Sequence, residues 1–69
     1  MELLINMFWD EEAKVWCAIN DEVGIAFESE TYDELVKRVV IAAPEMAKLN
    51  HVKFDGICFK SEFRMPVSA

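Results

Sequence analysis

Apolar side chains recur at every second position along three stretches in the first half of the chain. A repeat of two residues is the pattern of β-strands that bury one face. The stretches predict strands over residues 3–9, 15–20 and 25–27. A polar hairpin loop over 10–14 separates the first two strands, and a turn over 21–24 separates the second strand from the third. The pattern therefore predicts an antiparallel meander of three strands.

From residue 31 onward the apolar positions recur every three or four residues, the spacing of an amphipathic helix. Thr31 and Glu34 stand at the positions of a capping box, where each side chain bonds the backbone N–H of the other residue. We therefore expect the helix to begin at Thr31. Two acid-to-base pairs one turn apart are expected to add stability, Asp33 with Lys37 and Glu34 with Arg38. The apolar stripe contains Tyr32, Leu35, Val36, Val39, Val40, Ala43 and Ala47.

Pro44 interrupts this helical pattern. A proline inside a helix lacks the backbone N–H that its turn needs, and its ring crowds the preceding turn. We therefore expect either a kink at Pro44 or a break, followed by a short second helix from Pro44 to about Asn50.

Alternation returns after Gly56 and predicts a fourth strand over 57–65, which Pro66 ends. The order β-β-β-α-β places this strand most simply beside the first one and parallel to it, through a right-handed crossover. The predicted fold class is α+β. It is a single domain over 1–69, with a four-stranded mixed sheet in the order 3-2-1-4 and one helix on one face.

One helix can cover only one face of this sheet, so the other face is expected to be open. With a loop over 10–14, Phe8 would stand opposite Trp16 as an aromatic cross-strand pair on the open face. The side chains expected beneath the helix are Leu3, Ile5, Met7, Trp9, Val15, Cys17, Ile19, Ile25, Phe27, Ile57, Phe59, Phe63 and Met65. Those expected on the open face are Leu4, Phe8, Trp16, Ala18, Ala26 and Cys58, bordered by Asn6, Asn20, Glu28, Lys60 and Glu62.

Charge is distributed unevenly in a chain of net charge −6. Residues 1–34 hold ten acids and one base, a net of −9, and residues 35–69 hold three acids and six bases, a net of +3. The predicted topology brings seven acids to one end of the sheet: Asp10, Glu11, Glu12, Glu28, Glu30, Asp33 and Glu34. They can be solvated turns beside a helix N-terminus, a surface for a basic partner, or a cation site, although their spacing matches no calcium loop.

Few side chains in this sequence suit catalysis or cofactor binding. Cys17 and Cys58 are far apart and lie in no metal-binding motif, so we interpret them as free thiols in a reducing cytoplasm. His51 has no obvious nucleophilic partner, and Gly24 and Gly56 are the only glycines, so no phosphate-binding loop is present. The chain shows neither a signal peptide nor an apolar run that could span a membrane. We expect no catalytic residue, metal or cofactor.

Two motifs nevertheless resemble a known family. Residues 15–24 read VWCAINDEVG, and residues 29–35 read SETYDEL. This arrangement resembles the core of the HicB antitoxins, in which a strand leads into a P-D-x-P-G-like turn, a short strand and a G-D-T-x-x-E-A helix start. Asp21, Gly24, Thr31 and Glu34 occupy matching positions. The resemblance covers about residues 3–65 and is closest to small HicB-like bacterial proteins.

The resemblance implies a truncated ribonuclease-H-like fold without nuclease activity. It also implies neutralisation of a small basic RNA-cleaving toxin of the HicA type by direct binding. Asn20 and Val23 replace the turn prolines of the family, and Ser29 replaces the glycine before the helix. HicB antitoxins usually carry a C-terminal DNA-binding segment, which we do not expect here because the sequence stops at Ala69.

The leading hypothesis is a cytoplasmic, non-enzymatic protein-interaction domain whose partner is a small basic protein or a second copy of the chain. We expect no membrane partner and no direct contact with nucleic acid. Two alternatives are a self-associating structural module and a metal-dependent ribonuclease-H-like enzyme that uses the acidic end. The residues expected to bind the partner are Leu4, Phe8, Trp16, Ala18, Glu11, Glu12, Glu30 and Asp33.

Overall fold

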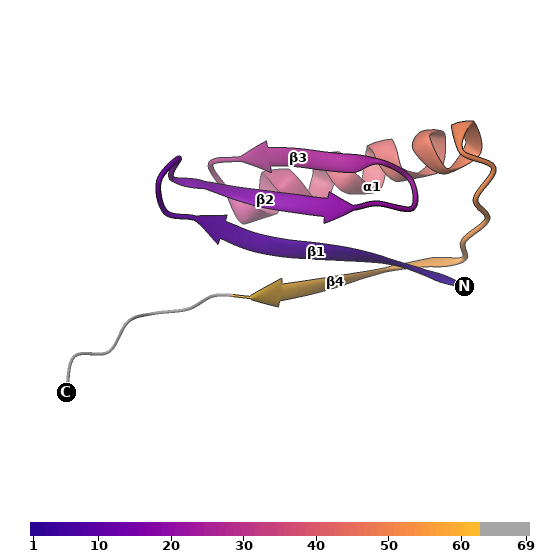
Figure 1. Ribbon diagram of the computed structural model, residues 1–69, viewed down its shortest axis with the longest axis horizontal. Helices are drawn as coiled ribbons and strands as arrows, with labels where there is room; N and C mark the ends of the chain where they lie inside the picture. The colour runs from indigo at the N-terminus through magenta and orange to yellow at the C-terminus, as the bar shows by residue number, and fades with distance from the viewer. Residues whose placement is uncertain (63–69) are drawn as a thin grey trace.

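Four strands and one helix make up the structure (Figure 1). The computed structural model describes residues 1–62, so the predicted end of the last strand, with Phe63 and Met65, lies outside the described residues. The elements are β1 (Glu2–Asp10), β2 (Val15–Asn20), β3 (Ile25–Ser29), α1 (Tyr32–Leu49) and β4 (Gly56–Glu62).

The strands form one mixed sheet in the order β3-β2-β1-β4. β2 pairs antiparallel with both β1 and β3, and β4 pairs parallel with β1. α1 lies on one face of the sheet, closest to β3 and β2 (Figure 1). The α+β class, the element order, the sheet order and the one-sided helix cover are therefore confirmed. In the described part of the chain, no helix is long and apolar enough to cross a membrane.

The core lies between the sheet and the helix. On the sheet, Leu3, Ile5 and Met7 alternate with exposed residues along β1 and are almost completely buried. On the helix, the buried residues are Leu35, Val39, Ala43 and Ala47, which recur at helical spacing along one stripe. The predicted inward alternation of β1 and the central positions of the helix stripe are thus confirmed.

The hairpin between β1 and β2 differs from its prediction by one residue. Phe8 pairs with Cys17, and Trp9 pairs with Trp16, so the predicted pairing of Phe8 with Trp16 is wrong. The loop is 11–14 rather than 10–14, because Asp10 still pairs with Val15 inside the ladder. A one-residue change of register turns every side chain of a strand to the opposite face.

Asp10 explains why this loop is short. Its carboxylate accepts hydrogen bonds from the backbone N–H groups of Glu12 (3.1 Å) and Ala13 (3.2 Å). Its carbonyl accepts one from the N–H of Lys14 (2.8 Å), which has a positive φ of 58°. These bonds close a tight turn directly after Asp10, since an Asp side chain readily bonds the backbone two or three residues ahead.

β2 is consequently turned over relative to the prediction. Trp16 and Ala18 lie on the helix side and not on the open face, and Ala18 is completely buried. Trp16 makes edge-to-face contacts with Trp9 and Tyr32, at centroid distances of 5.6 Å and 5.0 Å. The side chains predicted to lie beneath the helix from β2, namely Val15, Cys17 and Ile19, face the open side instead.

Asn20 is the polar residue that this register places in the core between the sheet and the helix. It is only 5% exposed, and its amide Nδ2 donates to the carbonyl of Leu4 (2.7 Å) while its Oδ1 accepts from the N–H of Val23 (3.0 Å). Val23 is itself fully buried, although the sequence pattern assigned it to an ordinary surface turn. Asn20 thus fixes the β2–β3 turn against β1.

We expect Asn20→Leu to lower the free energy of unfolding by about 1–3 kcal/mol, because it leaves the Leu4 carbonyl and the Val23 N–H without their buried partner. Urea unfolding followed by tryptophan fluorescence measures this change. The control is Asn6→Leu on the exposed face of β1, which should change stability by at most about 0.5 kcal/mol. Equal effects of the two variants would contradict the role given to Asn20.

The start of α1 contains half of the predicted capping box. Thr31 is the N-cap, and its Oγ1 accepts a hydrogen bond from the N–H of Glu34 (3.3 Å). The N–H of Thr31 donates to Ser29 Oγ (3.4 Å) in place of the Glu34 carboxylate. The Ser29 hydroxyl therefore accepts the hydrogen bond that the capping box assigns to Glu34.

Of the two outcomes expected at Pro44, a kink or a break, the break is absent, and α1 continues as one helix to Leu49. Pro44 cannot donate to the carbonyl of Val40 one turn earlier. Both residues lie on the exposed side of the helix, where water can bond that carbonyl instead. An exposed proline therefore leaves the buried stripe of the helix intact.

Residues just beyond the helix complete its C-terminal end. His51 has a positive φ of 56° and donates its N–H to Lys48 O, while the N–H of Val52 reaches Ala47 O (2.8 Å). This is a Schellman arrangement with histidine where glycine is usual. Asn50 Nδ2 also donates to Val23 O (3.3 Å), which ties the helix end to the β2–β3 turn.

Candidate functional site

One face of the sheet is not covered by any described element. We call the outward side chains of its four strands the open face. Among them, Leu4 is 42% exposed and Phe8 is 40% exposed, both from β1. The remaining members are Asn6, Val15, Cys17, Ile19, Ala26, Glu28, Cys58 and Lys60.

The cross-strand register gathers the apolar members of the open face. Cys17 on β2 stands between Phe8 on β1 and Glu28 on β3, and Ile19 stands between Asn6 and Ala26. On the other side of β1, Leu4 pairs with Cys58 of β4. An apolar stripe therefore runs diagonally across the sheet, from Ala26 and Ile19 to Leu4 and Cys58, with Asn6 and Glu28 beside it. Diagonal neighbours on one face of a sheet are within reach of long side chains.

Only part of the predicted binding surface is assembled in this way. Leu4 and Phe8 are on the open face as predicted, but Trp16 and Ala18 are beneath the helix, so Phe8 is the single aromatic member from β1 and β2. Cys17 and Ile19 take the positions that were assigned to Trp16 and Ala18. The sequence VWCAIN is apolar at five consecutive positions and carries no alternation that could have revealed them.

Carboxylates gather at one end of the sheet. We call this the acidic pole: Asp10, Glu11, Glu12, Glu28, Glu30, Asp33 and Glu34. The β1–β2 loop, the end of β3 and the first turn of α1 all lie at this end (Figure 1), so the predicted convergence of these elements is confirmed. Glu12, Glu28, Glu30, Asp33 and Glu34 are exposed.

Glu11 is used within the hairpin itself. Its carboxylate pairs with the ammonium of Lys14 and accepts a hydrogen bond from Trp9 Nε1 (2.6 Å). The hydrogen bonds from Lys14 and then from Trp9 lower the pKa of Glu11 below its usual value. Of the predicted partner-binding acids, Glu12, Glu30 and Asp33 therefore carry the charge that is free to attract a partner.

The cation–anion pairs predicted on the helix surface are not formed. Within residues 1–62 the ion pairs are Glu11 with Lys14 and the N-terminal ammonium with Asp55. Arg38 instead donates from Nη1 to the carbonyl of Glu28 (2.8 Å), and its guanidinium lies 5.5 Å from the centre of the Phe27 ring. Arg38, which was predicted to pair with Glu34, thus holds the end of β3 against the helix.

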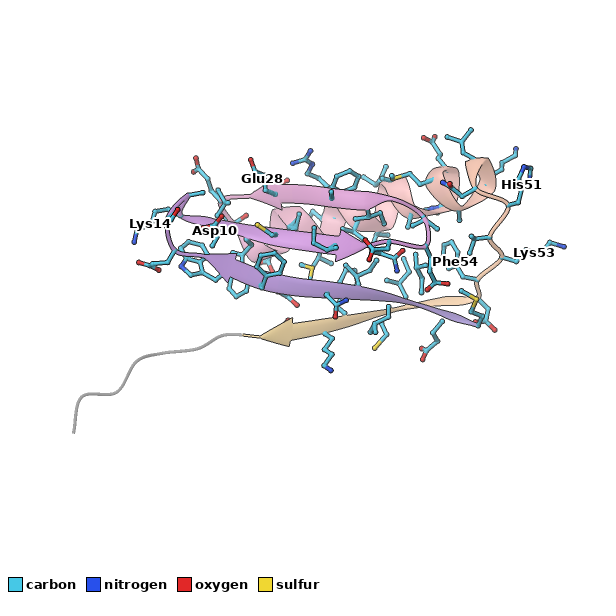
Figure 2. The ribbon with its side chains drawn as sticks, viewed as in Figure 1. Asp10, Lys14, Glu28, His51, Lys53 and Phe54 are labelled. Carbon is cyan, nitrogen blue, oxygen red and sulfur yellow. The ribbon has the colours of Figure 1, made fainter. Side chains whose placement is uncertain are left out.

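Cys17 lies close to two of these carboxylates. Burial raises the pKa of the Cys17 thiol, and the negative charges of Asp10 and Glu28 raise it further. Figure 2 shows Asp10 and Glu28 at the hairpin end of the sheet on either side of β2. A thiol in this setting stays protonated near neutral pH, so Cys17 contributes apolar surface and is a poor nucleophile.

The opposite end of the molecule carries basic side chains. A shallow hollow of about 780 Å³ lies where α1 passes into β4, with Val52 and Phe54 among its apolar lining. Lys48, His51 and Lys53 also line it, and Figure 2 shows His51, Lys53 and Phe54 at the end away from Asp10 and Lys14. In residues 1–62 no three His, Cys, Asp or Glu side chains come together closely enough to hold a metal ion.

Comparisons with known proteins place the chain in a family. Residues 2–65 match the family described as Domain of unknown function (DUF1902). A crystal structure of hypothetical protein TTHA1013 from the extremely thermophilic bacterium Thermus thermophilus matches with a TM-score of 0.75 and 31% sequence identity, over 100% of both chains. No curated protein matches the chain. The chain belongs to the DUF1902 family.

Proposed function

We propose that this chain is a non-enzymatic protein-interaction domain that binds a small basic protein. The observation that carries the proposal is the exposure of Leu4 and Phe8 on a sheet face without described cover, in a sheet whose hairpin end carries exposed carboxylates. Large apolar side chains in an open patch on a small domain are typical of a binding surface.

The open face and the acidic pole have complementary tasks in this proposal. Phe8, Leu4 and Ile19 supply the apolar centre that a partner would remove from water, as in the core of a protein interface. The acids at the hairpin end form part of its rim. Because the chain carries a net charge of −6, its field draws positively charged partners toward this rim and repels nucleic acid.

We further propose that the domain acts as a HicB-type antitoxin in the cytoplasm, with a truncated ribonuclease-H-like fold. Its partner would then be a small basic RNA-cleaving toxin, blocked by direct contact with the open face. Two features of the family motif support this proposal. Gly24 has the positive φ of 74° that its turn position requires, and Thr31 caps the helix as the motif expects.

Ionic strength tests the role of the acidic pole. We expect the association rate constant with a purified HicA-type RNA-cleaving protein to fall at least about tenfold between about 0.05 M and about 0.5 M salt, because counterions screen exposed charges. Stopped-flow fluorescence measures this rate. A matched variant with Glu12, Glu30 and Asp33 changed to Gln, Gln and Asn should associate slowly at low salt and respond weakly to added salt.

Two outcomes separate the parts of the proposal. A rate that does not change with salt, in both the natural chain and the neutralised variant, would remove electrostatic steering by the acidic pole. Failure of the chain to bind the RNA-cleaving protein at all, or to slow its cleavage of RNA, would remove the antitoxin function.

A further inference from the structure

We infer that the free edge of β4 is the contact between two copies of this chain. The two β4 strands pair antiparallel about a two-fold axis, so that two four-stranded sheets become one sheet of eight strands. This inference concerns the edge of the sheet and does not rest on the partner proposed for the open face.

β4 offers a long, regular edge. Its pairing with β1 is continuous. The first pair is Glu2 with Gly56, and the last is Phe8 with Glu62. Its other side faces no strand within residues 1–62, because β4 is the last strand in the sheet order. The strand contains neither proline nor bulge, two features that natural proteins use to protect exposed edges.

The opposite edge of the sheet, formed by β3, is protected from pairing with a further strand, unlike the β4 edge. β3 has only five residues, and Arg38 from α1 donates a hydrogen bond to the backbone carbonyl of Glu28 at that edge. The same guanidinium lies over Phe27 and so covers the strand. In the described part of the chain, no side chain bonds the backbone of β4 in this way.

Apolar surface beside the β4 edge is also left incompletely covered. Ile57 and Phe59 point to the helix side and are half-buried, whereas their partners on β1, Leu3 and Ile5, are fully buried. The difference arises because α1 lies over β2 and β3. A strand added next to β4 would shield Ile57 and Phe59 with its own helix-side residues.

Charge favours a second copy in antiparallel orientation as the occupant. β4 carries one base, Lys60, and one acid, Glu62, so the contact between two β4 strands carries little repulsion. The acidic pole lies beyond the end of β1, and Lys53 lies just before the start of β4. An antiparallel pair therefore places the hairpin part of the acidic pole, residues 10–12, about two strand spacings or ~10 Å from Lys53 of the other copy.

Sedimentation equilibrium of the full chain tests this arrangement. We expect a concentration-dependent shift from a mass of 8.0 kDa toward twice that mass, with weaker association at high salt. Cys58→Lys adds a positive charge to the edge strand. Depending on which residue lies at the two-fold axis, the new lysine faces either Lys60 of the other copy or the other copy's own substituted residue 58. It should weaken the association constant at least about tenfold, because like charges opposite each other repel.

Ala26→Lys is the matched control. Ala26 is likewise small and exposed, and it lies on the same face but on the protected edge strand β3, so this variant should associate as the natural chain does. A mass of 8.0 kDa at every concentration, or equal weakening by the two variants, would overturn the inference.

Hydrogen exchange of the natural chain provides a second test, which does not require a variant to fold. Amides of β4 that point away from β1 should exchange more slowly as protein concentration rises, while amides of β3 should not change. Exchange of β4 that is independent of concentration would overturn the inference. Unchanged partner binding in a Phe8→Glu variant that still forms dimers would instead count against the proposed function alone.

Discussion

Phe8→Glu should weaken binding of a basic RNA-cleaving partner about 100-fold while the domain remains folded. Phe8 is 40% exposed on the open face, paired with Cys17 and next to the stripe that includes Leu4 and Ile19. Aromatic residues at the centre of an interface commonly cost about 2 kcal/mol or more when they are lost, which corresponds to about 30-fold or more in affinity. The added carboxylate would also be desolvated in the complex, which increases the loss.

Titration calorimetry with the RNA-cleaving protein measures this effect, and inhibition of RNA cleavage gives an independent readout. Ile41→Glu is the matched control, since Ile41 is a 76% exposed apolar residue on the helix, far from the open face. It adds the same charge and removes a similar apolar area. Equal loss of affinity in both variants would show that the added charge, and not the open face, determines binding.

Trp16→Glu should unfold the domain. Trp16 packs beneath the helix against Trp9 and Tyr32, so a carboxylate there would lose these ring contacts and lie in an apolar setting. Replacing a large core aromatic typically costs about 3–5 kcal/mol. That cost is comparable to the roughly 3–5 kcal/mol that a core of this size supplies in total.

Circular dichroism and urea unfolding measure the outcome. Phe8→Glu serves here as the matched variant, because it makes the same kind of change on a neighbouring strand but on the opposite face of the sheet. A folded Trp16→Glu variant with stability close to that of Phe8→Glu would contradict the register of the β1–β2 hairpin.

The sheet order could be predicted from the sequence because each of its determinants is local. The alternation from Leu3 to Trp9 identifies the face of β1, and the threonine cap at Thr31 identifies where the helix starts. Together with the handedness of crossovers these signals leave one simple arrangement for the last strand. The structure follows them because no tertiary contact opposes them.

The face of β2 could not be predicted because it depends on a single residue of loop length. Asp10 closes the turn through its side chain while it still pairs with Val15, and this places Trp16 inside. The hydrogen bonds of Asn20 to Leu4 and Val23 stabilise that choice. In the apolar run of β2 both faces look equally suitable for burial, so only these long-range contacts select one.

The candidate site was affected by the same ambiguity. Leu4 and Phe8 were identified because β1 alternates clearly, whereas Cys17 and Ile19 were assigned to the wrong face with the rest of β2. The acidic pole was predictable because it depends on element order alone. Pro44 left two outcomes open, a kink or a break, because its effect on α1 depends on which side of the helix it occupies.

The parallel pairing of β1 with β4 has a consequence for the order in which the chain folds. Glu2 meets Gly56, and this closure spans 56 − 2 = 54 positions, far more than any hairpin contact in the sheet. Contacts between distant segments are slow to form. The meander and helix can therefore assemble on the ribosome while one side of β1 is still unpaired, and the synthesis of β4 decides when β1 gains its second neighbouring strand.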